Sequence, residues 1–365
     1  MCILLILLIK SSVYAMSFAY VSKRRKTDEK ASPSACSVKI ENELFVWKEF
    51  DSRGLKNILG SHASTLSWSS DGSYLAVGTV KGLILVIHFP NKIEGVMMMK
   101  IKLLSSIPRC IEWSKDKCFH FSAHNGHSFK FKMSTQSISE EHVKNMDEFY
   151  TSAFWKENIL FGKRHIYFIS DNKMIRTFGP GENLTSCMII ANDTLFVAYD
   201  YSQNSSSDKS IIAFSLPSCA PVSNQLTGCL FSYSYLCYSS PYVYGLTSDG
   251  KITRFFAKSP YKPDKHFGMS IKVPYGFKVH FDIKRNLLAY GDESGKLVMK
   301  KISCSIENRI KNKSLHGSNV WDQIVLKDFC DSSDPIINVK FHPKLNYIAF
   351  SRWKGGFDII PYNIF

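Results

Sequence analysis

The sequence lacks the short motifs that mark the common enzyme classes. It contains no G-x-G-x-x-G after a strand, no G-x-x-x-x-G-K-[ST], no G-x-S-x-G and no H-E-x-x-H. Each of these motifs places a phosphate cradle, a nucleophile or a pair of zinc ligands where its chemistry requires it. We therefore expect a protein without enzymatic activity and without a cofactor, and no residue stands out as catalytic.

Acidic residues are scarce relative to basic ones. The chain has 31 Asp and Glu against 46 Lys and Arg, which gives a formal net charge of +15. Such an excess favours association with polyanions, such as nucleic acid or an anionic membrane surface. The basic residues are scattered along the chain, however, so a merely soluble surface is the alternative.

Cysteine is frequent but never has the spacing of a metal or redox site. The ten cysteines form no C-x-x-C pair, and several stand in apolar runs such as Cys110-Ile111-Glu112-Trp113. This placement predicts small, buried, reduced thiols in an intracellular protein. The best metal candidate is the group His120, His124 and His127. These residues also fit the ordinary polarity of a hairpin turn, so we predict no metal site.

No apolar run reaches the length of about 20 residues that a membrane-spanning helix needs. Residues 2–9 are apolar and precede the small-residue segment that ends at Ala15, which is similar to a signal-peptide cleavage region. No positive side chain precedes the apolar stretch, and Met16 offers a second start. We expect no stable membrane insertion.

Residues 1–35 are predicted to form a tail outside the folded domain. The tail contains a basic run typical of a short nuclear-import signal, Lys23, Arg24, Arg25 and Lys26. The expected location is therefore the nucleus or the cytoplasm, with the nucleus favoured. Secretion is the alternative, in which case the four N-x-S/T sequons would accept glycans; they begin at Asn183, Asn192, Asn204 and Asn312.

What the sequence does contain is a repeated unit of strands and turns. The clearest copy runs from Leu66 to Ile87 and has two polar turns, Ser69-Ser70-Asp71-Gly72 and Lys81-Gly82, between three apolar segments. Seven copies can be placed, at residues 66–87, 107–131, 150–162, 187–214, 242–255, 279–299 and 339–360. Further strand candidates, such as Val96 to Leu104 and Val320 to Leu326, bring the unit to four strands.

Repeats of this kind are each too thin to bury an apolar face alone, and they predict blades packed around an axis. We expect an all-β fold over residues 36–365, a seven-bladed β-propeller of four-stranded antiparallel blades. The segment from Val38 to Phe50 precedes the first full copy. We predict that it supplies the outer strand of the last blade and so closes the ring.

These turns resemble those of the WD-repeat family over nearly all of residues 36–365. Ser69-Ser70-Asp71-Gly72 is similar to the first hairpin turn of that family, and Gly291-Asp292-Glu293-Ser294-Gly295 to its second. No copy ends its third strand in Trp-Asp, and the nearest approach to a Gly-His start is Gly60-Ser61-His62. We therefore expect the blades to rely more on apolar packing than on the buried polar network usual in the family.

The resemblance also implies a docking surface. In the family, the second turn of every blade and the loops entering the blades share one face around the channel. Here these positions hold Asn125, Asp249, Asp292 and Glu293, and the six residues predicted to bind a partner: Lys81, Arg109, His124, Arg352, Trp353 and Lys354. Trp353 is the strongest candidate, because an aromatic ring flanked by two cations offers apolar area and charge together. The competing interpretation is a ring folded back onto its own blade.

The leading functional hypothesis is a scaffold subunit of an intracellular, by preference nuclear, multiprotein complex that binds other subunits or peptides. A second hypothesis is nucleic-acid association, direct or within a complex, since divergent propellers of the general factors for RNA polymerase III are similar in charge and in degenerate repeats. A third is a secreted propeller hydrolase or lectin, which requires a true signal peptide.

Overall fold

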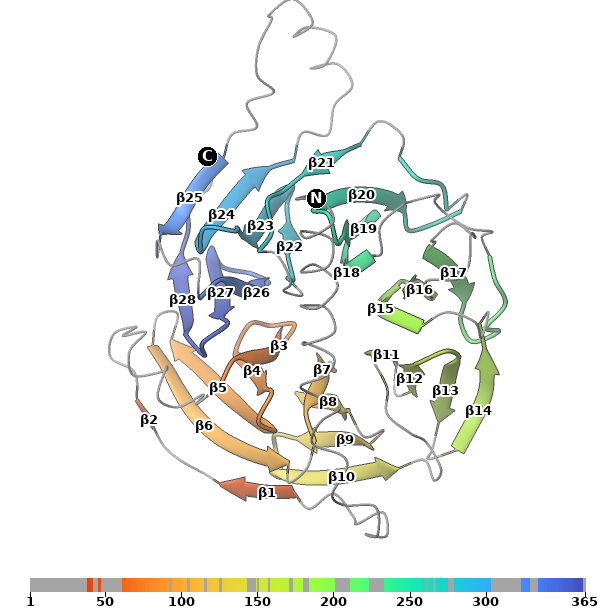
Figure 1. Ribbon diagram of the computed structural model, residues 1–365. Coiled ribbons are helices and arrows are strands. Elements are labelled where there is room, and N and C mark those ends of the chain that lie inside the picture. The colour runs from red at the N-terminus through yellow and green to blue at the C-terminus, as the bar shows by residue number, and fades with distance from the viewer. Residues whose placement is uncertain are drawn as a thin grey trace, which may run out of the picture.

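Seven small antiparallel sheets stand in a ring about a central axis (Figure 1). The computed structural model describes residues 38–41, 45–46, 61–91, 94–103, 106–114, 117–124, 127–142, 149, 151–156, 158–170, 173–179, 184–200, 211–222, 233–259, 261–264, 267–274, 279–302, 323–328 and 334–363. Every regular element in these ranges is a strand. The predicted all-β, seven-bladed propeller is confirmed.

The strands follow one another within each blade, from the axis outward (Figure 1). Blade 1 contains β3 (Ala63–Trp68), β4 (Tyr74–Thr79), β5 (Leu83–Asn91) and β6 (Glu94–Leu103), and blade 2 contains β7 (Pro108–Trp113), β8 (Cys118–Ala123), β9 (His127–Lys132) and β10 (Ser137–His142). Blade 3 contains β11 (Thr151–Trp155), β12 (Asn158–Gly162), β13 (Ile166–Ser170) and β14 (Lys173–Phe178), and blade 4 contains β15 (Leu184–Ala191), β16 (Thr194–Asp200) and β17 (Ile211–Ser215).

The second half of the ring repeats the pattern. Blade 5 contains β18 (Tyr233–Ser239), β19 (Tyr242–Thr247), β20 (Lys251–Phe256) and β21 (Met269–Ser270), and blade 6 contains β22 (Asp282–Lys284), β23 (Leu287–Gly291), β24 (Lys296–Lys301) and β25 (Gln323–Asp328). Blade 7 contains β26 (Ile336–Phe341), β27 (Tyr347–Arg352) and β28 (Phe357–Pro361). Within the described ranges, blades 4 and 7 therefore have three strands each.

The core is divided among the interfaces between neighbouring blades. In β4, Leu75 and Val77 pack toward blade 7 with Phe357, whereas Ala76 packs toward blade 2 with Phe119. Opposite faces of one strand thus bury side chains against two different blades. Because successive side chains point to opposite faces, the second strands are nearly continuous apolar runs in the sequence. Seven such clusters fill the ring, and the prediction of blades held by apolar packing is consistent with them.

The predicted role of the segment from Val38 to Phe50 is wrong. β1 (Val38–Glu41) and β2 (Phe45–Val46) both pair with β6 and extend blade 1 outward; neither pairs with β28 of the last blade. β6 has ten residues and offers a long hydrogen-bonding edge. β28 has only five and ends in Pro361, which has no N–H to donate to a neighbouring strand.

Blade 7 closes the ring against blade 1 through side chains. The Asn338 amide donates from Nδ2 to the backbone oxygen of Ala63 at 2.8 Å, and His342 donates from Nε2 to that of Gly72 at 3.0 Å. Leu75 and Phe357 lie in one shared apolar cluster. The closure therefore combines apolar contact with neutral hydrogen bonds.

The tail predicted for residues 1–35, with the basic run from Lys23 to Lys26, lies outside the described residues. The boundary at residue 36 stays a prediction for the same reason.

Candidate functional site

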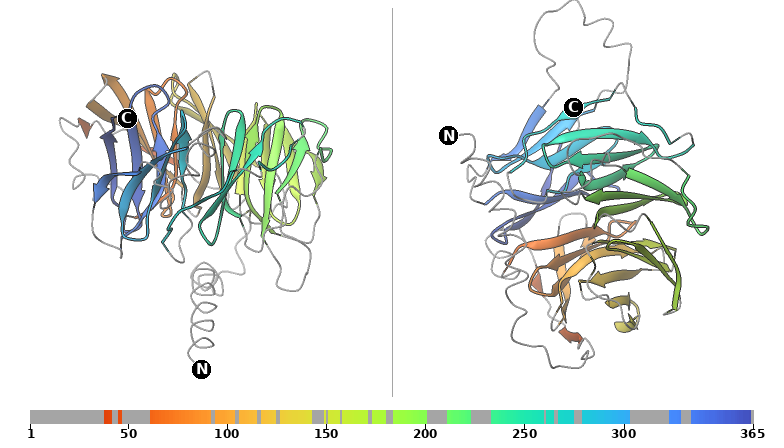
Figure 2. Two further views of the ribbon diagram at one scale, coloured as in Figure 1. Left: turned by 90° about the horizontal axis from the view of Figure 1, so that it is seen from above. Right: turned by 45° about the vertical axis from the view of Figure 1, so that its right-hand side comes forward.

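The ring has two faces, and the turns divide between them (Figure 2). We call upper the face formed by the second turn of each blade and by the segments leading into the first strands. Backbone bonds tie these parts together: Trp353 N donates to Pro335 O at 2.9 Å, and His124 N donates to Ile107 O at 2.9 Å. Val80 N, beside Lys81, donates to His62 O at 3.2 Å. These bonds tie the described second turns of blades 1, 2 and 7 to the segments that lead into their first strands.

The structure brings the predicted site residues to this face. Lys81, His124, Trp353 and Lys354 stand in second turns, and Arg352 ends the strand before its turn. Arg109 follows Pro108 at the start of β7, where the pairing with β8 has a bulge. Asp249, Asp292 and Glu293 occupy the equivalent turns of blades 5 and 6, whereas Asn125 lies outside the described residues.

The turn of blade 7 is organised around a buried carboxylate. The Asp334 side chain is only 1% exposed, and its Oδ2 lies 2.8 Å from Nη2 of Arg352. Its Oδ1 accepts a hydrogen bond of 2.6 Å from the backbone N of Lys354. Gly355 has φ +95°, and a Cβ there would lie 2.9 Å from the backbone oxygen of Ser61. These contacts hold the backbone on both sides of Trp353 in one conformation.

Trp353 itself packs across the boundary between two blades. Its ring stacks on that of His62, which leads into blade 1, with centroids 4.2 Å apart and planes 23° apart. Burial lowers the pKa of His62, which favours the neutral ring in this stack. Trp353 nevertheless keeps 41% of its surface exposed. The ring therefore contacts the segment that leads into the neighbouring blade.

Charge is unevenly distributed around the upper face. Lys354, Lys81, Arg109 and Arg164 are exposed on blades 7, 1, 2 and 3, which are consecutive in the ring; we call these four residues the basic arc. Blades 5 and 6 present acidic turns instead. There Asp249 lies 3.1 Å from Lys251, and Glu293 lies 3.3 Å from Lys272. The basic arc thus faces a rim that is acidic to neutral.

Sequence reasoning missed a set of ionisable side chains on the first strands of the blades. Lys340 of β26 lies 3.6 Å from Asp282 of β22, measured from Nζ to Oδ1, and Phe341 N donates to Asp282 Oδ2 at 2.8 Å. Burial alone would lower the pKa of Lys340, but Asp282 and Tyr235 raise it well above its ordinary value. A charged residue inside an otherwise apolar strand, as in Val339-Lys340-Phe341, was the available signal.

Glu112 of β7 has a similar position between blades 2 and 3. Its Oε2 accepts a hydrogen bond of 3.2 Å from the backbone N of Phe154, on β11. The side chain keeps contact with solvent, yet the surrounding blades remove much of the bulk water, which raises its pKa from 4.5 to about 7. The hydrogen bond and the charge of Lys340 act in the opposite direction.

The histidines considered as metal ligands have separate surroundings. His120 lies beside Phe154, with ring centroids 5.3 Å apart, and His127 Nδ1 makes a close contact with Glu140. No group of three His, Cys, Asp or Glu side chains within the described ranges is placed to hold a metal ion. Cys110, Cys118, Cys187, Cys219 and Cys237, the cysteines that the structure describes, are free thiols.

Comparison with known proteins assigns the chain to no family. No family model matches the chain, and no curated protein is significantly similar to it. The similarity to WD-repeat proteins therefore rests on the seven-bladed ring, and membership of that family stays a prediction. Where the structure describes the chain, there is no helix long and apolar enough to cross a membrane.

Proposed function

We propose that this protein is a non-enzymatic platform that holds a partner protein on the upper face, as a subunit of an intracellular and by preference nuclear complex. The supporting observation is Trp353. It is a large aromatic side chain that remains 41% exposed although the turn carrying it is anchored on both sides. Tryptophan is among the residues that most often dominate the binding energy of protein interfaces.

Rigidity of the surrounding turns supports the same proposal. Binding costs free energy whenever loops and side chains must be ordered, so a surface that is already ordered keeps more of its contact energy as affinity. Here the turn of blade 7 is held by the buried Asp334, and Trp353 rests on His62 of the next blade. A partner would meet an anchor that needs no rearrangement.

The basic arc gives the proposal a preferred partner chemistry. Lys354, Lys81 and Arg109 follow one another on blades 7, 1 and 2, so an acidic segment of a partner protein can run along them. A nucleic-acid duplex wide enough to cover the whole face would also meet the pairs Asp249–Lys251 and Glu293–Lys272, where the acidic groups offset the attraction of the lysines for phosphate. The charge distribution therefore favours an acidic protein segment over nucleic acid.

The test compares two exposed aromatic residues. Full-length protein is used to capture partners from cells, and recovery of each identified partner is quantified for wild type, Trp353→Ala and Phe256→Ala. Phe256 is a matched control, because it is 39% exposed but lies at the far end of β20, away from the upper face. We expect Trp353→Ala to lower recovery of a stoichiometric partner by about tenfold or more, the loss typical of an interface hot spot, and Phe256→Ala to leave it unchanged.

Equal recovery by wild type and Trp353→Ala would contradict the proposal for this residue. The nucleic-acid alternative is tested on the same proteins with a short DNA duplex at low ionic strength. Binding through phosphates weakens steeply as salt is added. Tight duplex binding with such a salt dependence, abolished by Lys81→Glu, would favour that alternative over a protein partner.

A further inference from the structure

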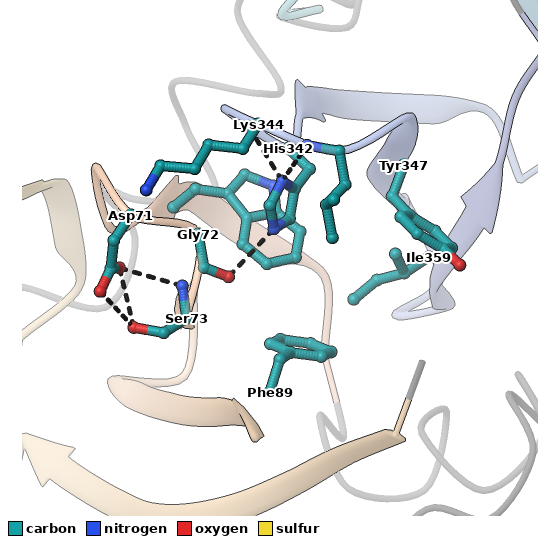
Figure 3. A pocket seen from close by; sticks show the side chains of 10 residues that line it. Asp71, Gly72, Ser73, Phe89, His342, Lys344, Tyr347 and Ile359 are labelled. Carbon is teal, nitrogen blue, oxygen red and sulfur yellow. Dashed lines mark hydrogen bonds between the residues drawn. The ribbon is translucent and has the colours of Figure 1, made fainter. Parts of the chain in front are cut away.

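A pocket of about 210 Å³ opens on the face opposite to Trp353, at the boundary between blades 7 and 1 (Figure 3). This lower face is formed by the turns between the first and second strands, here 69–73 of blade 1 and 342–346 of blade 7. Trp68, Phe89, Leu345, Tyr347 and Ile359 supply its apolar lining. The proposed function does not use it.

The polar groups of His342 and Asp71 on the walls of the pocket form hydrogen bonds with other groups of the same two turns. His342 accepts backbone hydrogen bonds at Nδ1 from Lys344, at 3.1 Å, and from Leu345, at 2.9 Å, while its Nε2 donates to Gly72 O. Asp71 accepts hydrogen bonds from Ser73 N and from both Ser69 and Ser73 hydroxyls. Figure 3 shows these two turns side by side, joined by the bond between His342 and Gly72, with Tyr347 and Ile359 on the other side of the pocket. The pocket is therefore held open by rigid walls.

One donor in the lining differs from the others. The indole Nε1 of Trp68 is buried, and no acceptor lies within hydrogen-bonding distance of it among the described residues. The ring is wedged between Phe89, with centroids 5.2 Å apart, and His342, with centroids 4.7 Å apart. Because this N–H is shielded from solvent, the Trp68 ring offers an occupant of the pocket apolar contact and not a hydrogen bond.

The size of the pocket limits its occupant. An apolar cavity of about 150 Å³ holds one benzene molecule, and sites for cofactors and drug-sized ligands run from about 300 to 1,000 Å³. At about 210 Å³ the pocket matches a single aromatic or large aliphatic side chain. It is too small for a nucleotide or a comparable cofactor.

The charges around the opening indicate what flanks that side chain. Lys344 stands at the rim, Lys117 of blade 2 is close enough to act on Asp71, and Arg285 is exposed on the neighbouring turn of blade 6. Asp71 is the single acid among them, and hydrogen bonds from Ser69 and Ser73 keep it ionised, with a pKa of about 2 although burial opposes this. The surroundings are net positive and complement an acidic chain.

We propose that this pocket binds one phenylalanine or large aliphatic side chain of an acidic peptide segment in a partner protein, with that side chain packed against the apolar lining that includes the Trp68 ring. The walls fix the position of the side chain, and the lysines at the rim select acidic neighbours. The site lies on the opposite face from Trp353, so a partner bound there leaves the upper face accessible.

The probe is a short acetylated and amidated peptide with one phenylalanine between two pairs of glutamates. The readout is the indole N–H resonance of Trp68 in the full chain, assigned by its loss in Trp68→Phe. We expect this resonance to shift as the peptide is added, because the phenylalanine ring would then lie against the indole of Trp68. A peptide with alanine in place of phenylalanine should bind about 30-fold more weakly, since burying a phenylalanine ring contributes roughly 2 kcal/mol.

Two variants block the site without removing a buried contact. Leu345→Trp fills the pocket from its rim and should weaken binding by at least about tenfold. Lys344→Glu should weaken it at low salt and have little effect at high salt, because exposed charges are screened. Lys258→Glu, on an exposed loop of blade 5, is the matched control and should bind as wild type does.

An unmoved Trp68 resonance, equal binding of the phenylalanine and alanine peptides, or wild-type binding by Leu345→Trp would each overturn the inference. Trp353→Ala should bind the probe normally, so failure here and failure of the proposed function are distinguishable.

Discussion

The two boundaries of blade 7 are joined in different ways. Toward blade 6 the links are ionic: Lys340 faces Asp282, and Lys284 donates to the backbone oxygens of His342 and Leu345 at 2.5 and 2.7 Å. Toward blade 1 the links are neutral, from the Asn338 amide and the His342 ring to backbone oxygens. The same blade thus uses charge on the side that continues the ring and neutral groups on the side that closes it.

The comparison shows where this propeller concentrates its exposed features. The closing boundary carries Trp353 stacked on His62 at the upper face and the pocket beside Trp68 at the lower face. β1 and β2, expected to reinforce blade 7, instead extend blade 1. Because blade 7 meets blade 1 through short turns and side chains, aromatic groups remain accessible there. The boundary that closes the ring therefore carries both of the sites that we propose as partner-binding sites.

The largest expected effect comes from the closing boundary, at Gly72. It has φ +78°, and a Cβ added there would lie 2.2 Å from Cε1 of His342. Gly72→Ala combines the left-handed backbone penalty with displacement of the His342 ring, so we expect a loss of roughly 3 kcal/mol in the free energy of unfolding. Urea denaturation measures it.

Gly268→Ala is the control for that measurement, because an added Cβ there meets nothing within 4 Å and its φ is not in the left-handed region. It should change the free energy of unfolding by less than about 0.5 kcal/mol. Similar losses in the two variants would show that the closing boundary does not depend on the fit between Gly72 and His342.

A smaller effect is expected at the ionic boundary, from Asp282→Asn. The amide oxygen can still accept from Phe341 N, but Lys340 loses its counter-charge in a site where its own side chain is 28% exposed and that of Asp282 is 15% exposed. Removing one partner of a fully buried pair costs about 3 to 5 kcal/mol, and the partial exposure here reduces our expectation to about 2 kcal/mol.

The matched control is Glu293→Gln, which removes an ion pair with Lys272 whose side chains are 54% and 82% exposed. Exposed pairs of this kind contribute about 0 to 1 kcal/mol. If Asp282→Asn proved no more destabilising than Glu293→Gln in urea denaturation, the Lys340–Asp282 pair would contribute little to the boundary between blades 6 and 7. Apolar contacts would then stabilise this boundary, and it would not differ from the closing boundary in using charge.

The sequence predicts the blades because their pattern is local. Val96 to Leu104 and Val320 to Leu326 were expected as strands, and they correspond to β6 and β25. An apolar run bounded by polar turns has the same meaning wherever the blade stands in the ring. The placement of the turns that carry Lys81, Trp353 and Lys354 on one face came instead from the resemblance to the WD-repeat family.

The contacts that join blades are not encoded in any local pattern. Asn338 bonds to a residue 275 positions away, and His342 to one 270 positions away. The wrong assignment of β1 arose in the same way, because an edge strand can pair with any free edge of matching length. The pocket forms only where the last blade meets the first, and the charged set around Lys340 forms only where the first strands of blades 6 and 7 meet. Both therefore emerge only from the folded ring.

The smallest expected effect is a pH dependence at the boundary between blades 2 and 3. Glu112 accepts from a first-strand backbone N as Asp282 does, but only Asp282 has a lysine within ion-pair distance among the described residues. Desolvation by the surrounding blades raises the pKa of Glu112 from 4.5 to about 7. The folded state therefore holds this proton more tightly than the unfolded state does, and the contribution of Glu112 to stability falls as pH rises from about 4.5 to about 7.

Glu112→Gln removes the titration and should be more stable than wild type above pH 7, with the difference shrinking toward pH 4.5. Thermal unfolding across this range measures the difference, with Glu293→Gln as the control expected to follow wild type. A difference independent of pH would contradict a raised pKa for Glu112 in the folded state.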